Sequence, residues 1–149
     1  MNASNPLDTL IEQSRKARDQ AGRSLADDRR GQAQSAAQLD ALRRYRQEYC
    51  RRLQDAMGRG IDAATLANYR RFIRSLDDAI DAALRALDQQ QEKVAASQQH
   101  WRQRQRQLSS YDTLASRRAE QARQQEQRRE RRDNDEQTNN AMARRARRD

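Results

Sequence analysis

A seam of mostly apolar or small residues, with some polar positions among them, recurs every three or four positions through most of this 149-residue chain. In the first half this seam runs through Leu7, Leu10, Ser14, Ala17, Ala21, Leu25, Asp28, Gln32, Ser35, Leu39, Leu42, Arg46, Tyr49, Leu53 and Ala56. In the second half it runs through Leu66, Tyr69, Ile73, Leu76, Ile80, Leu84, Leu87, Gln91, Val94, Gln98, Trp101, Gln105, Leu108, Asp112, Ala115, Ala119 and Ala122. Alternating steps of three and four place such residues on one helix face, so the seam predicts two long helices of the coiled-coil type.

The seam is interrupted at "MGRGID", where Gly58 and Gly60 lie within three residues. Glycine costs about 1 kcal/mol relative to alanine inside a helix, and it readily adopts the positive φ that ends one. Because a short loop makes consecutive helices antiparallel neighbours, we expect an all-α fold, a long two-helix antiparallel coiled-coil hairpin. The expected elements are a helix over about 6–57, a turn over about 58–62 and a helix over about 63–122 or beyond.

Both expected helices begin at residues that favour helix N-termini. Asn5 followed by Pro6 is typical of an N-cap with proline in the first helical position, and Asp62 or Thr65 can cap the second helix. With the turn centred between Gly60 and Ile61, residues at the same level have numbers that add to about 121. Trp101 therefore falls opposite small residues of the first helix, namely Ala17, Ala21 and Gly22.

The composition agrees with a thin helical rod, since 34% of residues are hydrophobic, 36% are charged and the mean hydropathy is −1.39. Disorder also suits a chain of this composition, and the sustained periodicity favours helices. The basic C-terminal tail, about 123–149, contains no apolar stripe, so we expect it to fray or to be disordered when alone. The whole chain is expected to form one coiled-coil domain.

Several classes of function are disfavoured by what the sequence lacks. It has neither a glycine-rich phosphate loop nor a nucleophile elbow, and His100 and Cys50 lie in polar helical surroundings, so we expect neither catalysis nor a metal or cofactor. The 31 Lys and Arg residues alternate with carboxylates, which favours a solvated coiled-coil flank; nucleic-acid binding and a generic structural adaptor remain the alternatives. No apolar run is long enough to span a membrane and the N-terminus does not resemble a signal peptide, which predicts a cytoplasmic protein.

A second apolar stripe lies beside the seam near the turn. On each helix it steps by four, three and four residues, and the two halves match in height across the hairpin: Gln38, Leu42, Tyr45 and Tyr49 on the first helix, and Phe72, Leu76, Ala79 and Ala83 on the second. A two-stranded coil buries only its seam, so Tyr45 and Phe72 should stay partly exposed and form a partner-binding surface. A seam that is merely wider here, and stiffens the turn, is the alternative.

At these residues the sequence resembles the bacterial flagellar export protein FliJ family. The resemblance is strongest over residues 38–84, in "YRQEY", "MGRGI" and "NYRRFIRSLDDAI", and weaker in "WRQRQRQL". It implies a non-catalytic, stalk-like coiled coil of the flagellar type III export apparatus. Such a protein would lie in the cytoplasm, peripheral at the cytoplasmic face of the inner membrane through protein partners, without direct membrane insertion or nucleic-acid binding.

The resemblance also implies three kinds of partner. The terminal end of the hairpin would bind the export ATPase hexamer, and the chain would assist the recycling of export chaperones. The stripe near the turn would bind the cytoplasmic domain of the large export-gate subunit through Gln38, Leu42, Tyr45, Tyr49, Phe72, Leu76, Ala79 and Ala83. Ala83 departs from the family, which has a histidine at this position.

Overall fold

The structure, a computed structural model, describes residues 5–148 and consists of two helices, α1 (Pro6–Arg59) and α2 (Ala63–Arg148). No strand occurs among these residues. The predicted all-α fold with two packed helices is confirmed. The chain divides into two compact units. We call Ala17–Arg104 the hairpin unit, and we call residues 5–16 together with 105–148 the terminal unit.

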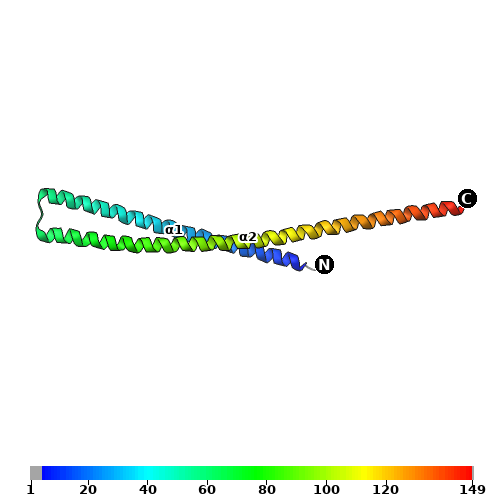
Figure 1. The fold of residues 1–149 in the computed structure, drawn as a ribbon, viewed down its shortest axis with the longest axis horizontal. Helices are drawn as coiled ribbons and strands as arrows, with labels where there is room; N and C mark the ends of the chain where they lie inside the picture. Colours follow the sequence, from blue (N-terminus) through cyan, green and yellow to red (C-terminus); the bar gives the residue numbers. More distant parts are fainter. Residues whose placement is uncertain (1–4, 149) are drawn as a thin grey trace. The chain divides into compact units, whose positions relative to one another are not determined.

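Within the hairpin unit, the parts of α1 and α2 run side by side in opposite directions and are joined by a short loop (Figure 1). α1 ends at Arg59, two residues beyond the expected end, because the helix continues through Gly58. The next residue, Gly60, has a φ of 87°, and its N–H donates to the Met57 carbonyl over 3.2 Å. This positive φ, which L side chains rarely adopt, stops α1 and reverses the chain.

Each helix begins at a residue that caps it. The Leu7 N–H donates to Asn5 Oδ1 over 3.1 Å, and the Thr65 N–H donates to Asp62 Oδ1 over 3.3 Å. Hydrogen bonding from Thr65 lowers the pKa of Asp62 below its usual value. A carboxylate whose pKa falls on folding stabilises the folded chain above its unfolded pKa, about 3.9, and this contribution is lost as the pH falls through the lower folded pKa.

The two glycines of the turn allow a matched test of this geometry. We expect Gly60→Ala to destabilise the hairpin by about 1 kcal/mol, because alanine is strained at a positive φ. We expect Gly58→Ala to stabilise it by about 0.5–1 kcal/mol, because this helical glycine has open space where a Cβ would lie. Urea denaturation followed by circular dichroism measures both changes. A stabilising Gly60→Ala would contradict the turn described here.

The core of the hairpin unit is a narrow line of buried side chains: Ala21, Leu25, Leu39, Leu76 and Ala83. The seam predicted four of these five residues. It was wrong at Leu84, which is 37% exposed, while the preceding Ala83 is buried. A straight helix drifts relative to a strict heptad repeat, so the inward position moves by one residue over several turns.

Polar contacts join the two arms away from the turn. Arg46 Nε lies 2.5 Å from Asp77 Oδ1, and this hydrogen bond raises the pKa of Arg46. Further along, the Ser97 hydroxyl donates to an Asp28 carboxylate oxygen. These pairs keep the polar seam positions of the mid-hairpin hydrogen-bonded, as half-buried polar groups require.

The single tryptophan confirms the predicted level of the arms. A Cβ added to Gly22 would lie 3.4 Å from Trp101 Nε1 and 3.5 Å from Trp101 Cδ1, so the indole lies directly against this glycine. The two residue numbers add to 123, close to the expected 121. An indole placed against a residue without a side chain lets two helices approach closely without an overpacked core.

The terminal unit has a small core and a long exposed helix. Leu7, Ser14 and Leu108 are buried there, whereas Leu10, which the seam predicted to face inward, is exposed. Every described side chain from 116 to 148 is exposed, yet α2 continues to Arg148. This stretch contains no glycine or proline and is rich in Arg, Gln, Glu and Ala, so local propensity favours helix there without a packing partner. The fraying of the isolated tail stays a prediction about solution behaviour.

Candidate partner-binding surface

Four aromatic side chains form one cluster near the turn of the hairpin unit. The Tyr49 ring lies at its centre, with its centroid 4.2 Å from that of Phe72, 5.9 Å from that of Tyr45 and 6.2 Å from that of Tyr69. Tyr45 stacks on Tyr49 at an interplanar angle of 20°, and Tyr69 is tilted by 60°. Arg52 Cζ lies 5.4 Å from the centroid of the Tyr49 ring, within cation–π range.

Helical spacing and the turn together build this cluster. Tyr45 and Tyr49 are four residues apart on α1, and Tyr69 and Phe72 are three apart on α2, so each pair shares a helix face. The antiparallel return places the two faces side by side. Tyr49 and Phe72, whose numbers add to 121, are in ring contact as the sequence predicts.

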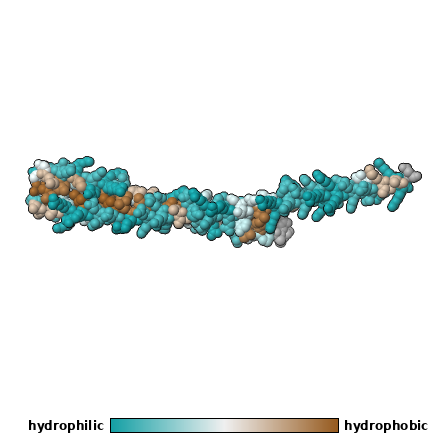
Figure 2. All heavy atoms as spheres, viewed as in Figure 1, coloured by the Kyte–Doolittle hydropathy of each residue, from teal (hydrophilic) through white to brown (hydrophobic). Residues whose placement is uncertain are grey.

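Part of the cluster remains open to solvent. Tyr45 is 53% exposed and Phe72 is 38% exposed, so both rings are open to solvent although they are large and hydrophobic. Figure 2 shows apolar residues gathered toward the turn end of the hairpin unit on the face in view, within an otherwise hydrophilic surface. Contiguous exposed aromatic surface of this kind is typical of protein interaction sites.

The remaining stripe residues differ in accessibility. Gln38 is exposed, Leu42 and Ala79 are half-buried, and Leu76 and Ala83 are buried. Leu76 and Ala83 therefore expose little surface of their own to a partner in this structure. The exposed and half-buried members, Gln38, Leu42, Tyr45, Tyr49, Phe72 and Ala79, are the ones that a partner could reach. That any of these residues binds a partner stays a prediction.

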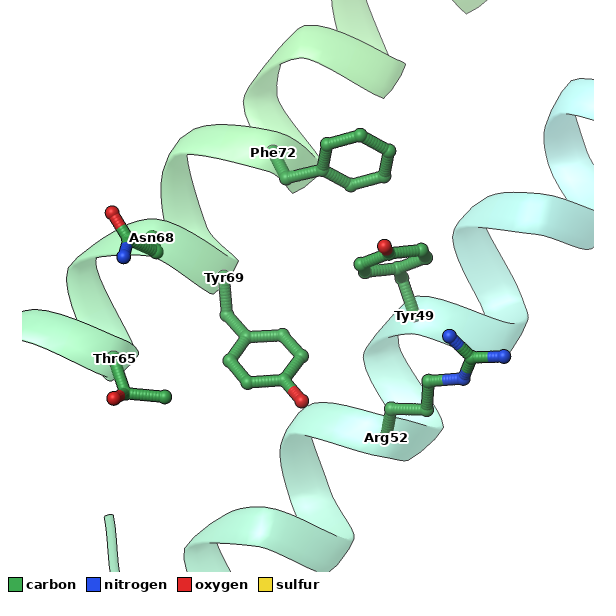
Figure 3. Close-up of a pocket in the computed structure, with 6 residues that line it drawn as sticks. All are labelled: Tyr49, Arg52, Thr65, Asn68, Tyr69 and Phe72. Carbon is green, nitrogen blue, oxygen red and sulfur yellow. The ribbon is translucent and has the colours of Figure 1, made fainter. Parts of the chain in front are cut away.

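An open pocket of about 260 Å³ adjoins the cluster, and we call it the turn pocket (Figure 3). Arg52 and Tyr49 line it from α1, and Thr65, Asn68, Tyr69 and Phe72 line it from α2. In Figure 3 the Phe72 ring points toward Tyr49, and the Tyr69 hydroxyl points toward α1. Of these six residues, the predicted stripe contained Tyr49 and Phe72, and Tyr69 was predicted only as part of the seam. Arg52 was not predicted, although its position three residues after Tyr49 on one helix could have indicated it.

The segments that form the turn pocket are rich in positive charge. Between residues 43 and 74 there are nine arginines and three carboxylates, which gives a net charge of +6, against +9 for the whole chain. Arg52 Nη2 lies 2.8 Å from Glu48 Oε1. This pair is exposed and four residues apart on one helix, so it orients the guanidinium but adds only a few tenths of a kcal/mol.

Groups for metal binding or membrane spanning were not found in the part of the chain that the structure describes. No three His, Cys, Asp or Glu side chains cluster there in a way that could hold a metal ion. None of the helical stretches within residues 5–148 combines the length and apolarity needed to cross a bilayer. The turn pocket itself presents aromatic rings, a guanidinium group, a hydroxyl and an amide.

Known proteins resemble this chain over most of its length. A family model described as "Flagellar FliJ protein" matches residues 3–147. The Flagellar FliJ protein of Salmonella typhi is 36% identical over 111 residues, which cover 74% of this chain and 76% of that protein. The Flagellar FliJ protein of Escherichia coli (strain K12) is 34% identical over 113 residues, covering 76% and 77% respectively. Among solved structures, the YscO homolog CT670 from Chlamydia trachomatis covers 91% of this chain and 92% of its own, with a TM-score of 0.48 and 15% identity.

Proposed function

This chain belongs to the flagellar FliJ protein family, and on that premise we propose that it is a non-catalytic component of the flagellar type III protein export apparatus. In this proposal the chain is a stiff helical adaptor between the export ATPase and the export gate. It has two separate binding regions, the aromatic cluster in the hairpin unit and the basic helix of the terminal unit. It resides in the cytoplasm and reaches the inner membrane through its protein partners.

The aromatic cluster is proposed to bind the cytoplasmic domain of the large export-gate subunit. The exposure of Tyr45 and Phe72 is the single observation that carries this assignment. Burial of such rings would stabilise a two-helix protein, so their exposure lowers its stability. A partner that covers the rings explains why they are nevertheless exposed. Tyr and Phe are rigid anchors that lose little side-chain entropy on binding, which suits them to central positions of an interface.

The terminal unit is proposed to bind the export ATPase ring. Residues 116–148 carry eleven arginines and six carboxylates, a net charge of +5, and all of their side chains are exposed. An extended basic helix is attracted to an acidic protein surface, and this attraction weakens as salt screens it. Binding to the assembled ring but not to free subunits would shift the subunits toward the ring by mass action. Export chaperones are the third proposed class of partner.

A binding experiment with the double variant Tyr45→Ala/Phe72→Ala tests the gate assignment. We expect this variant to bind the gate's cytoplasmic domain at least about tenfold more weakly, because two anchor rings are lost. Leu114→Ala, which removes a side chain of similar exposure from the terminal unit, is the matched control and should bind as wild type does. Isothermal titration calorimetry with purified proteins measures these affinities.

Thermal stability separates this proposal from the wider-seam alternative. If the double variant melts earlier but binds the gate domain normally, the rings serve only the hairpin, and the gate assignment fails. Unchanged melting with weakened binding supports it. The same melting curves, recorded by circular dichroism, verify that Leu114→Ala is folded.

A further inference from the structure

The turn pocket combines an apolar wall with a polar, cationic rim. Three aromatic rings, those of Tyr49, Tyr69 and Phe72, form the wall, and Arg52, Thr65 and Asn68 complete the lining. Because Tyr49 contacts both other rings and Arg52 Cζ, this wall is already assembled without a ligand. A preformed site loses less side-chain entropy on binding than one that must be assembled.

The size of the pocket restricts its occupant. Its volume of about 260 Å³ lies just below the range of about 300–1,000 Å³ that is usual for small-molecule sites. The pocket is also open, and its lining comes from two adjacent helices rather than from a closed cavity (Figure 3). These dimensions suit one bulky side chain of a polypeptide that crosses the two helices.

The charge around the pocket selects the chemistry of that polypeptide. The segment 43–74 has a net charge of +6, so a cationic partner would be repelled and an acidic partner attracted. At the pocket itself the cation is Arg52, which the Glu48 carboxylate and the Tyr49 ring hold in place. A guanidinium carries five N–H donors in a planar fork that matches a carboxylate, so it can bind a second carboxylate beside Glu48.

We propose that the turn pocket binds a short acidic peptide segment, in which one bulky apolar side chain enters between the rings and a neighbouring carboxylate binds Arg52. This inference rests on the proposed function, because the segment would belong to the cytoplasmic domain of the export gate. It adds a specificity-determining residue, Arg52, that the apolar stripe does not contain. It also assigns a binding role to Thr65, Asn68 and Tyr69 as the lining of the pocket.

A peptide accounts for the pocket better than an anionic lipid surface does. A lipid surface attracts arginines according to their number, with little regard to which one is removed. The structure instead places a single arginine beside three rings. Recognition should therefore depend strongly on Arg52 and weakly on the adjacent Arg51, which carries the same charge one residue away and is not part of the lining.

The test measures the affinity of the full-length chain for the purified gate cytoplasmic domain by titration calorimetry. We expect Arg52→Gln to weaken binding at least about tenfold and Arg51→Gln to weaken it less than about twofold. Arg52→Lys keeps the charge but loses the fork, so its affinity should fall between those of wild type and Arg52→Gln. Arg52 makes an exposed pair, so melting temperatures should stay unchanged and exclude misfolding as the cause.

Equal losses of affinity in Arg51→Gln and Arg52→Gln would overturn the inference, because they would show that the gate domain responds to the overall positive charge and not to Arg52 itself. Sedimentation with vesicles of phosphatidylglycerol and phosphatidylethanolamine is the second test. If the wild-type chain binds the vesicles and Arg52→Gln abolishes this binding while Arg51→Gln does not, the pocket binds lipid and the inference is overturned. The proposed function fails separately, if wild type and Tyr45→Ala/Phe72→Ala bind the gate domain equally. If that double variant is weakened while Arg52→Gln binds like Arg51→Gln, only the inference about the pocket fails.

Discussion

Leu39→Asp is expected to destabilise the hairpin unit by about 4 kcal/mol or more, and so to lower the melting temperature by about 10 °C or more. Leu39 is only 5% exposed and lies in the narrow core line of the hairpin unit. An aspartate at this position would place an unpaired negative charge against apolar side chains. A structure with so few buried residues has little stability in reserve, since folded domains are stable by only about 5–15 kcal/mol in total.

Leu84→Asp is the matched control for that substitution. It introduces the same residue into a helix at a position that the seam pattern predicted to face inward and that the structure leaves 37% exposed. We expect it to cost less than about 1 kcal/mol, mainly through the lower helix propensity of aspartate. Thermal melts by circular dichroism measure both variants. Comparable losses of stability in the two variants would show that Leu84 faces inward, as the strict heptad pattern predicts, and would contradict the exposure of Leu84 in this structure.

If the terminal unit binds the export ATPase ring as proposed, removal of the tail is expected to abolish the effect of this chain on the ATPase while leaving the melting temperature of the chain unchanged. A variant that ends at Ala122 keeps the buried Leu7, Ser14 and Leu108 and loses only side chains that are exposed in the described part of α2. The removed residues are exposed, and their contacts, such as the pair between Arg123 and Glu120, lie within α2 itself. Exposed residues of this kind contribute within about 0.5 kcal/mol each, so the melting curve should superimpose on that of wild type. Oligomerisation and turnover of the purified ATPase, with and without the chain, measure the functional half of the prediction.

A full-length tail with fewer positive charges provides the control for the truncation. Changing Arg144, Arg145, Arg147 and Arg148 to glutamine keeps the length and helix propensity of the tail and removes four positive charges. We expect this variant to retain part of the wild-type effect at low salt and to lose it at a lower salt concentration than wild type does. Full ATPase stimulation by the truncated variant would contradict the proposal that the terminal unit binds the ring.

Much of the fold follows from residue spacing alone. The glycine pair predicted the reversal, the seam predicted the buried Leu25, Leu39 and Leu76, and the matched stripes predicted that Tyr49 and Phe72 meet. These predictions succeeded because they depend on helix geometry, which is regular, and on a loop too short to allow another arrangement.

The predictions from sequence were wrong where helix packing decides which of two adjacent residues faces inward. Ala83 rather than Leu84 faces inward, although leucine is the more apolar, because helix phase over several turns decides the position. The sequence left open how far the second helix continues, and α2 reaches Arg148 because helix propensity without burial suffices to build it in this structure. Arg52 was not predicted because it belongs to the site through its contact with the Tyr49 ring, one helical turn away. The periodicity of apolar residues cannot indicate a contact made by a charged side chain.

The contact between Trp101 and Gly22 gives this molecule an intrinsic optical probe. The chain contains one tryptophan, and that indole lies against the opposite arm at a place remote in sequence from the turn. Its fluorescence spectrum therefore reports how closely the arms approach there, without labels and without interference from other indoles. Loosening of the arms during assembly would shift the emission maximum to longer wavelengths as water reaches the ring.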